Sequence, residues 1–201
     1  MSESGQASIL IDQMEILQIV QGWGIMRDSG RLDLLRETFA SGALMHTSSS
    51  SGPADEFLDK AGKAAPSGGT SQHVFGGANI EIRGDKALSD SRMLVMSRRS
   101  VHGVEVDLTA FTRLFDRFVR TSAGWRILER FPFYERSRLD LVQLTDRLKV
   151  DLAPFADYPP GLRYVAFVQK ANGRDVPEQT LFMNGNGFSG IQAQWREWLA
   201  S

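Results

Sequence analysis

Three histidines, His46, His73 and His102, are the residues of this chain best suited to proton transfer. The imidazole group titrates near neutral pH, so that a histidine can remove or return a proton under physiological conditions. Separations of 27 and 29 residues lack the short spacing that places two metal ligands on one element, and we expect no metal site. Cysteine is absent from the sequence, which excludes thiolate nucleophiles, zinc ribbons and disulfides.

Other common catalytic motifs are missing from the sequence. The glycine clusters Gly76-Gly77 and Gly185-Asn186-Gly187 match no phosphate-binding pattern and are better explained by turns or bulges. No serine lies in a G-x-S-x-G elbow. Nucleotide binding and serine hydrolysis are therefore not expected.

The composition excludes several partners. There are 23 basic and 24 acidic side chains, a net charge of -1, so no field of one sign attracts nucleic acid or an anionic membrane. No apolar run approaches the roughly 18 residues of a membrane span. The N-terminal residues lack the basic and apolar segments of a secretory signal. We expect a cytoplasmic protein that binds neither nucleic acid nor membrane.

The elements that must position the histidines begin with helices. From residue 9 to residue 26, apolar side chains recur every three or four residues, which predicts an amphipathic helix. Asp28-Ser29-Gly30 ends that pattern, and a second short helix is predicted to carry Leu32, Leu34, Leu35 and Phe39. A strand is expected at 43–47, and Pro53 is placed to begin a third helix that ends near Ala65.

Antiparallel strands make up the next part of the chain. Turn residues separate predicted strands near 72–82, 86–99, 104–120 and 125–134. The last three exceed the usual length of about five or six residues, so the sheet should bend strongly around the N-terminal helices. Helices followed by a sheet indicate the α+β class.

Beyond residue 136 the sequence changes character. Residues 150–160 are irregular and contain prolines, 162–170 is apolar enough for a helix, and 191–199 carries two tryptophans. We predict one domain at 9–135 and a C-terminal extension at 136–201 that packs on the same domain.

Four local strings occur in a fixed order. They are Asp28-Ser29-Gly30 before Leu34-Leu35 and Phe39, Gln72-His73-Val74 before Asn79, Gly84-Asp85-Lys86-Ala87, and the hairpin from Asp116 to Arg130. Together they resemble the SnoaL-like domains of the nuclear transport factor 2-like superfamily, over residues 9–135. The resemblance implies a cone-shaped, strongly curved antiparallel sheet wrapped around N-terminal helices, with an apolar pocket inside. It also implies a homodimer that forms through the outer face of the sheet.

The branch of the superfamily that resembles scytalone dehydratase has a catalytic dyad. An aspartate ends the first helix and a histidine begins the strand after the third helix, and Asp28 and His73 occupy those positions here. The resemblance implies that His73 removes a proton and that Asp28 orients it, with no metal or organic cofactor. Elimination follows if the substrate carries a leaving group β to the reacting carbon. Isomerisation or cyclisation follows if it carries a conjugated carbonyl group.

Each dyad residue, and each remaining histidine, has a structural alternative. Asp28 can simply cap a helix end, and a histidine at a strand entrance, such as His73, is often only structural. His46 has no obvious acidic partner, and His102 lies in a predicted hairpin turn. Both are expected to be structural or solvated.

Five further residues are candidates for contacts with a substrate: Trp23, Met93, Phe111, Arg113 and Phe115. Aromatic and methionine side chains on curved strands more often pack in the core than contact a ligand. An ion pair at the surface or between strands explains Arg113 better than a contact with a polar substrate group.

The chain also departs from the pattern of that branch. Its first tyrosine is Tyr134, so the N-terminal tyrosines that hold a leaving water are missing, and Arg31 replaces a common second acid. We therefore keep three hypotheses. The protein is a cofactor-independent lyase or isomerase acting on a small hydrophobic or cyclic molecule, a noncatalytic small-molecule-binding protein, or a scaffold subunit like the small subunit of ring-hydroxylating dioxygenases.

Overall fold

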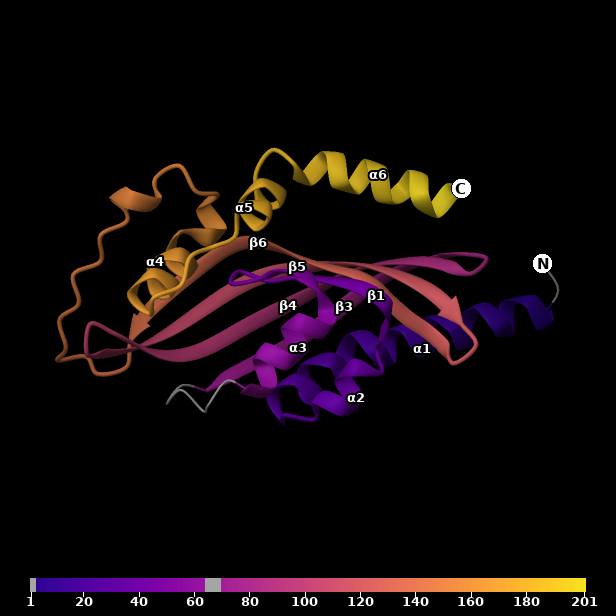
Figure 1. Cartoon of the computed structure of the whole chain (residues 1–201), viewed down its shortest axis with the longest axis horizontal. Helices are drawn as coiled ribbons and strands as arrows, with labels where there is room; N and C mark the ends of the chain where they lie inside the picture. The colour runs from indigo at the N-terminus through magenta and orange to yellow at the C-terminus, as the bar shows by residue number, and fades with distance from the viewer. Residues whose placement is uncertain (1–2, 64–69) are drawn as a thin grey trace.

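The computed structural model describes residues 3–63 and 70–201, which form helices on both sides of one sheet (Figure 1). The N-terminal helices are α1 (Glu3–Asp28), α2 (Leu32–Arg36) and α3 (Ala54–Lys63). The strands are β1 (Phe39–His46), β2 (Ser51–Pro53), β3 (Ser71–Arg83), β4 (Lys86–Val101), β5 (Val104–Thr121) and β6 (Gly124–Leu141). Two 3₁₀ turns, η1 (Ala153–Phe155) and η2 (Pro160–Leu162), precede α4 (Arg163–Ala171), α5 (Glu178–Asn184) and α6 (Phe188–Ala200).

The sheet has six strands in the order β2-β1-β6-β5-β4-β3. Neighbouring strands are antiparallel except for β1 and β6, which run parallel. Strands β4, β5 and β6 have 16, 18 and 18 residues, and they twist and bend along the molecule (Figure 1). The predicted α+β class and the curved sheet are confirmed.

The N-terminal part differs from the prediction where the second helix ends. The hydroxyl group of Thr38 donates to the Leu35 carbonyl (2.7 Å), and the Thr38 carbonyl accepts the N–H of Ile127 (2.8 Å). These bonds stop α2 and start the pairing of β1 with β6, so that Phe39 begins a strand instead of closing the helix. The predicted end of the third helix, near Ala65, lies outside the described residues.

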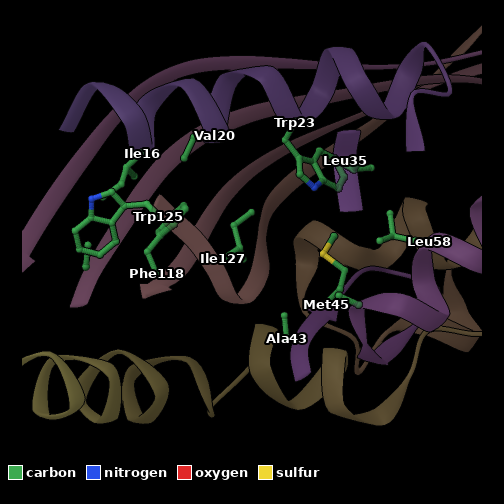
Figure 2. Close-up of a cluster of buried hydrophobic side chains, with 12 residues drawn as sticks. Ile16, Val20, Trp23, Leu35, Ala43, Met45, Leu58, Phe118, Trp125 and Ile127 are labelled. Carbon is green, nitrogen blue, oxygen red and sulfur yellow. The ribbon is translucent and has the colours of Figure 1, made fainter. Parts of the chain in front are cut away.

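Two layers of buried side chains lie on opposite faces of β5 and β6, because alternate residues of a strand point to opposite faces. The inner layer joins α1 to these strands and includes Ile16, Val20, Phe118, Trp125 and Ile127 (Figure 2). The outer layer joins α5 and α6 to the same strands and consists of Phe115, Phe131, Met183 and Trp195.

Asp12 fastens α1 to the hairpin between β5 and β6. Its carboxylate accepts two hydrogen bonds from the Arg120 guanidinium (2.7 and 2.6 Å) and one from the Trp125 indole N–H (3.0 Å). The bonds from Arg120 hold the pKa of Asp12 below its usual value, because they favour the charged carboxylate. The first half of α1 is thereby fixed, which sets the place of its last turn.

The C-terminal extension completes the hydrogen bonding of β6. The pairing of β6 with β1 ends at Arg130, and beyond it the buried Asn184 of α5 takes the place of a neighbouring strand. The Asn184 side chain accepts the Tyr134 N–H (2.7 Å) and donates to the Pro132 carbonyl (3.2 Å). In η2, Gly161 lies so close to β6 that a Cβ would stand 2.0 Å from the Tyr134 carbonyl oxygen. The extension therefore shares a core with the strand.

Replacing Asn184 with alanine should lower the free energy of unfolding by about 2 kcal/mol or more, because two backbone groups of β6 would be buried without partners. Chemical denaturation followed by circular dichroism measures the loss. The exposed Asn186 lies two residues away, and Asn186→Ala should change stability by less than about 0.5 kcal/mol. Equal stability of the two variants would contradict the role assigned to Asn184.

Candidate active site

A cavity of about 440 Å³ lies on the inner face of the sheet. Its wall is built by α1, α3, α4, β1 and the four strands from β3 to β6, together with the loops after β1 and α4. Apolar side chains line much of it: Trp23, Met45, Phe57, Met93, Leu114 and Val165. A cavity of this size suits a small organic molecule. The pocket expected from the sequence is present, and its wall is partly polar.

Asp28 and His73 meet beside this cavity. Asp28 Oδ1 lies 2.6 Å from His73 Nδ1, and Asp28 Oδ2 accepts the backbone N–H of His73 at 2.7 Å. Because the carboxylate accepts at Nδ1, the proton of the neutral ring belongs on that nitrogen and Nε2 keeps its lone pair. The ring lines the cavity, and Nε2 has no hydrogen-bond partner among the described residues. His73 is therefore arranged as a base.

The last turn of α1 carries Asp28 to His73. A carboxylate is unfavourable at the C-terminal end of a helix, where the helix dipole is negative, so the two bonds to His73 explain the position better than helix capping does. The helix can come this close because residue 24 is glycine. A Cβ at Gly24 would lie 2.6 Å from the His73 carbonyl oxygen and 2.9 Å from the Phe75 ring.

A fully buried ion pair between Arg130 and Asp116 stands on the same wall. Arg130 Nε and Nη2 donate to the two Asp116 oxygens at 2.8 and 2.7 Å. The guanidinium also lies over the Trp23 ring, 4.9 Å from its centroid, and Trp23 meets the His73 ring edge to face. Within the described residues, Arg130 Nη1 and Trp23 Nε1 are buried donors without a partner. An acceptor atom on a bound molecule would satisfy them.

The expectation that His46 lacks an acidic partner is wrong. Its Nε2 lies 3.1 Å from Glu129 Oε1, and its Nδ1 lies 2.7 Å from Ser51 Oγ. Burial raises the pKa of Glu129, but the bond with His46 and the charge of Arg117 outweigh burial and hold that pKa below its ordinary value. Both nitrogens of His46 are thus engaged, as befits a structural residue. His102 occupies the exposed turn between β4 and β5, as predicted.

Tyr134 reaches the cavity from β6, so the lack of an N-terminal tyrosine does not leave the site without a phenol. Burial raises the pKa of Tyr134, and hydrogen bonding with Ser48 only partly opposes this effect. The hydroxyl group therefore stays neutral near pH 7 and can donate a hydrogen bond. The sequence alone predicts a role in the site for neither Tyr134 nor Arg130.

The predicted substrate contacts separate into two groups. Trp23 and Met93 line the cavity. The other three, Phe111, Arg113 and Phe115, are not among the residues that line it, because they alternate with the inward Leu114 along β5 and point to the outer face. Arg113 forms an ion pair with Asp90 of β4, which is the alternative that its position between strands suggested.

In the described part of the chain, no three His, Asp or Glu side chains are grouped so that they could hold a metal ion. That part also contains no helix long and apolar enough to cross a membrane.

Comparison with known proteins identifies the family. Residues 8–130 match the model of the SnoaL-like domain, and the chain belongs to that family. Pea pathogenicity protein 2 of Fusarium vanettenii is 25% identical over 170 residues, which cover 83% of this chain and 73% of that protein. A PEP2-like protein of the same fungus is 24% identical over 171 residues, which cover 84% and 73% of the two chains.

Solved structures with the same fold come from Novosphingobium aromaticivorans. An NTF2-like protein with a cystatin-like fold is 24% identical, with a TM-score of 0.51 over 64% of this chain and 85% of that one. A candidate scytalone dehydratase is 14% identical, with a TM-score of 0.55 over 72% and 99% of the two chains. The beta subunit of a candidate aromatic-ring-hydroxylating dioxygenase is 17% identical, with a TM-score of 0.52 over 72% and 95%. At these identities the likeness establishes the fold alone, and the fold does not decide the function.

Gly24→Ala should push α1 away from β3 and weaken the contact of Asp28 with His73. Overpacking of this kind costs about 1–3 kcal/mol, so the midpoint of chemical denaturation should fall. Nitrogen-15 NMR of the imidazole would show whether His73 keeps its proton on Nδ1.

Gly22→Ala is the matched control, because its Cβ would meet only the Met26 side chain, at 3.6 Å, and alanine is the better helix former. It should keep both the stability and the tautomer. If Gly24→Ala also kept both, the close approach would not be what assembles the dyad.

Proposed function

We propose that this protein is a cofactor-independent lyase or isomerase in which His73 removes a proton from a small hydrophobic or cyclic substrate and Asp28 orients the ring. The proposal is carried by the 2.6 Å contact of Asp28 Oδ1 with His73 Nδ1 beside an internal cavity. This contact leaves Nε2 as the basic nitrogen. The carboxylate also stabilises the positive charge that the ring gains with the proton.

The donors on the cavity wall suit the second requirement of such chemistry. Removal of a proton next to a carbonyl group moves negative charge onto the carbonyl oxygen, which then needs hydrogen-bond donors. Trp23 Nε1 and Arg130 Nη1 are buried donors without partners in the described structure, and the neutral Tyr134 hydroxyl is a third group on the wall. Return of the proton to another carbon gives isomerisation. Loss of a leaving group from the β carbon gives elimination.

The outer face of the sheet bears on the remaining hypotheses. A scaffold subunit and the expected homodimer would both use this face. Helices α5 and α6 pack over part of it through Phe115, Phe131, Met183 and Trp195, which leaves less of it for another chain. This arrangement favours a role for the cavity, either in catalysis or in noncatalytic binding of a small molecule.

A proton-abstracting enzyme should incorporate deuterium from D₂O into a bound ketone, at the carbon next to the carbonyl group. Cyclic ketones with and without a β-hydroxyl group serve as test compounds, and proton NMR follows the exchange. His73→Ala should slow the exchange by about 100-fold or more. Asp28→Asn should slow it as well, because the ring loses the carboxylate that fixes its tautomer.

His102→Ala, in the exposed turn between β4 and β5, is the matched histidine control and should exchange at the wild-type rate. Exchange that survives His73→Ala would rule out His73 as the base. Ketones that bind in the cavity without any exchange would identify the protein as a noncatalytic binder.

A further inference from the structure

The charged side chains around the cavity are of one sign. Four arginines line it, Arg27, Arg99, Arg130 and Arg174, and no aspartate or glutamate is among the described residues that do. Arg130 is neutralised by Asp116 behind it. The other three form no ion pair within the described structure, although the whole chain is nearly neutral. The cavity therefore carries a local positive charge, although the net charge of the whole chain is only -1.

These three arginines gather toward the solvent-exposed end of the cavity. Arg174 is exposed and Arg27 and Arg99 are half-buried, whereas wall residues such as His46 and Leu114 are buried. Arg27 comes from the last turn of α1, Arg99 from β4, and Arg174 from the segment between α4 and α5. Three separate parts of the chain thus deliver guanidinium groups to one place.

Burial disfavours the charged forms of Arg99 and Arg27. Burial, and then the positive charges of Arg174 and Arg27, lower the pKa of Arg99. Burial also lowers the pKa of Arg27. The acid beside Arg27 is Asp28, whose two oxygens are both bonded to His73, and Asp175, beside Arg174, pairs with Lys170. Like charges that are partly removed from water repel each other unless an anion joins them.

We infer that the cavity takes an apolar molecule that carries a carboxylate, with Arg27, Arg99 and Arg174 binding the carboxylate and His73 facing the reacting carbon. This inference names the substrate class of the proposed function and rests on that function for the role of His73. Guanidinium groups bind carboxylates through paired, charge-assisted hydrogen bonds. The apolar side chains farther in, including Trp23, Met93 and Leu114, suit the rest of such a molecule.

The strand β3 sets the spacing between the two ends of the ligand. Arg99 Nη2 donates to Ser71 Oγ at 2.8 Å, and Ser71 and His73 lie two residues apart on the same face of β3. Alternate residues of a strand are about 7 Å apart. The carboxylate should therefore stand roughly that far from the carbon that loses its proton, a separation of several bonds.

Binding of matched acid and amide pairs tests the inference. The probes are benzoate and benzamide, 2-naphthoate and 2-naphthamide, and cyclohexanecarboxylate and its amide, measured by isothermal titration calorimetry. At least one acid should bind about tenfold or more tightly than its amide, and added salt should reduce the difference. Arg27→Gln and Arg99→Gln should each remove most of the preference. Arg83→Gln, at the other end of β3, changes the net charge equally and should keep it.

The results separate this inference from the proposed function. If no acid binds, if acid and amide bind equally, or if the preference survives Arg27→Gln and Arg99→Gln, the inference is wrong, even where His73-dependent exchange is seen with neutral ketones. If the acids are preferred but no cyclic ketone exchanges, including one that carries a carboxylate such as 4-oxocyclohexanecarboxylate, the anion site stands and the catalytic proposal fails. His73→Ala should retain the preference for acids in every case, because its loss removes no positive charge from the exposed end.

Discussion

The close approach of α1 to β3 at Gly24 is the contact on which the site depends. Asp28 and His73 are 45 residues apart in the sequence, and their bond forms only where the helix backbone nearly touches the strand. The other half of α1 is fastened by Asp12 to Arg120 and Trp125. A helix held at both ends against a curved sheet can shift at one of them only at a cost in stability. The geometry of the dyad is therefore fixed by packing along the whole of α1.

A second constraint comes from the charges buried on the same wall as the dyad. Removing the Arg130 and Asp116 side chains from water costs several kcal/mol per ion, and such pairs return this cost only when their hydrogen bonds are complete. Here the pairing is bidentate but Arg130 Nη1 has no partner in the described structure. The aromatic face of Trp23 covers part of the guanidinium. The unpaired Nη1 reduces what the ion pair contributes to stability. On a cavity wall, however, the same N–H group can donate a hydrogen bond to a ligand.

Much of this arrangement was accessible from the sequence, and the failures have a common cause. Helical periodicity located α1, and turn residues located β3 to β6. The resemblance to the scytalone dehydratase-like branch then assigned the dyad to Asp28 and His73 by their places in that order. Side-chain direction on the strands was harder. A bulge at Leu128 shifts the register, because Arg117 pairs with Glu129 whereas Phe118 pairs with Ile127. Trp125 and Ile127 face inward, so regular alternation along β6 would make Arg130 face outward. The extra residue Leu128 reverses the alternation, and Arg130 faces inward.

The same limit explains the substrate contacts on β5 and the partner of His46. Nothing in the sequence of β5 says which of two alternating sets faces the helices, since Leu114 and Phe115 are both buried, one on each face. His46 meets Glu129 because β1 pairs in parallel with β6, a pairing between segments 83 residues apart. Long-range pairing of this kind leaves no local signal.

The C-terminal extension lies beyond the residues that the family model matches. The family match ends at residue 130, yet Pro132, Tyr134 and the α4 residues Val165 and Val168 complete the cavity wall. The extension also supplies Asn184, which satisfies the edge of β6 just where Tyr134 turns inward. Asp28 and His73 thus belong to the part that the family model matches, whereas Val165, Val168 and Arg174 on the cavity wall belong to the extension. Selection of the bound molecule can change through the extension while the dyad stays as it is, because the two are built by different parts of the chain.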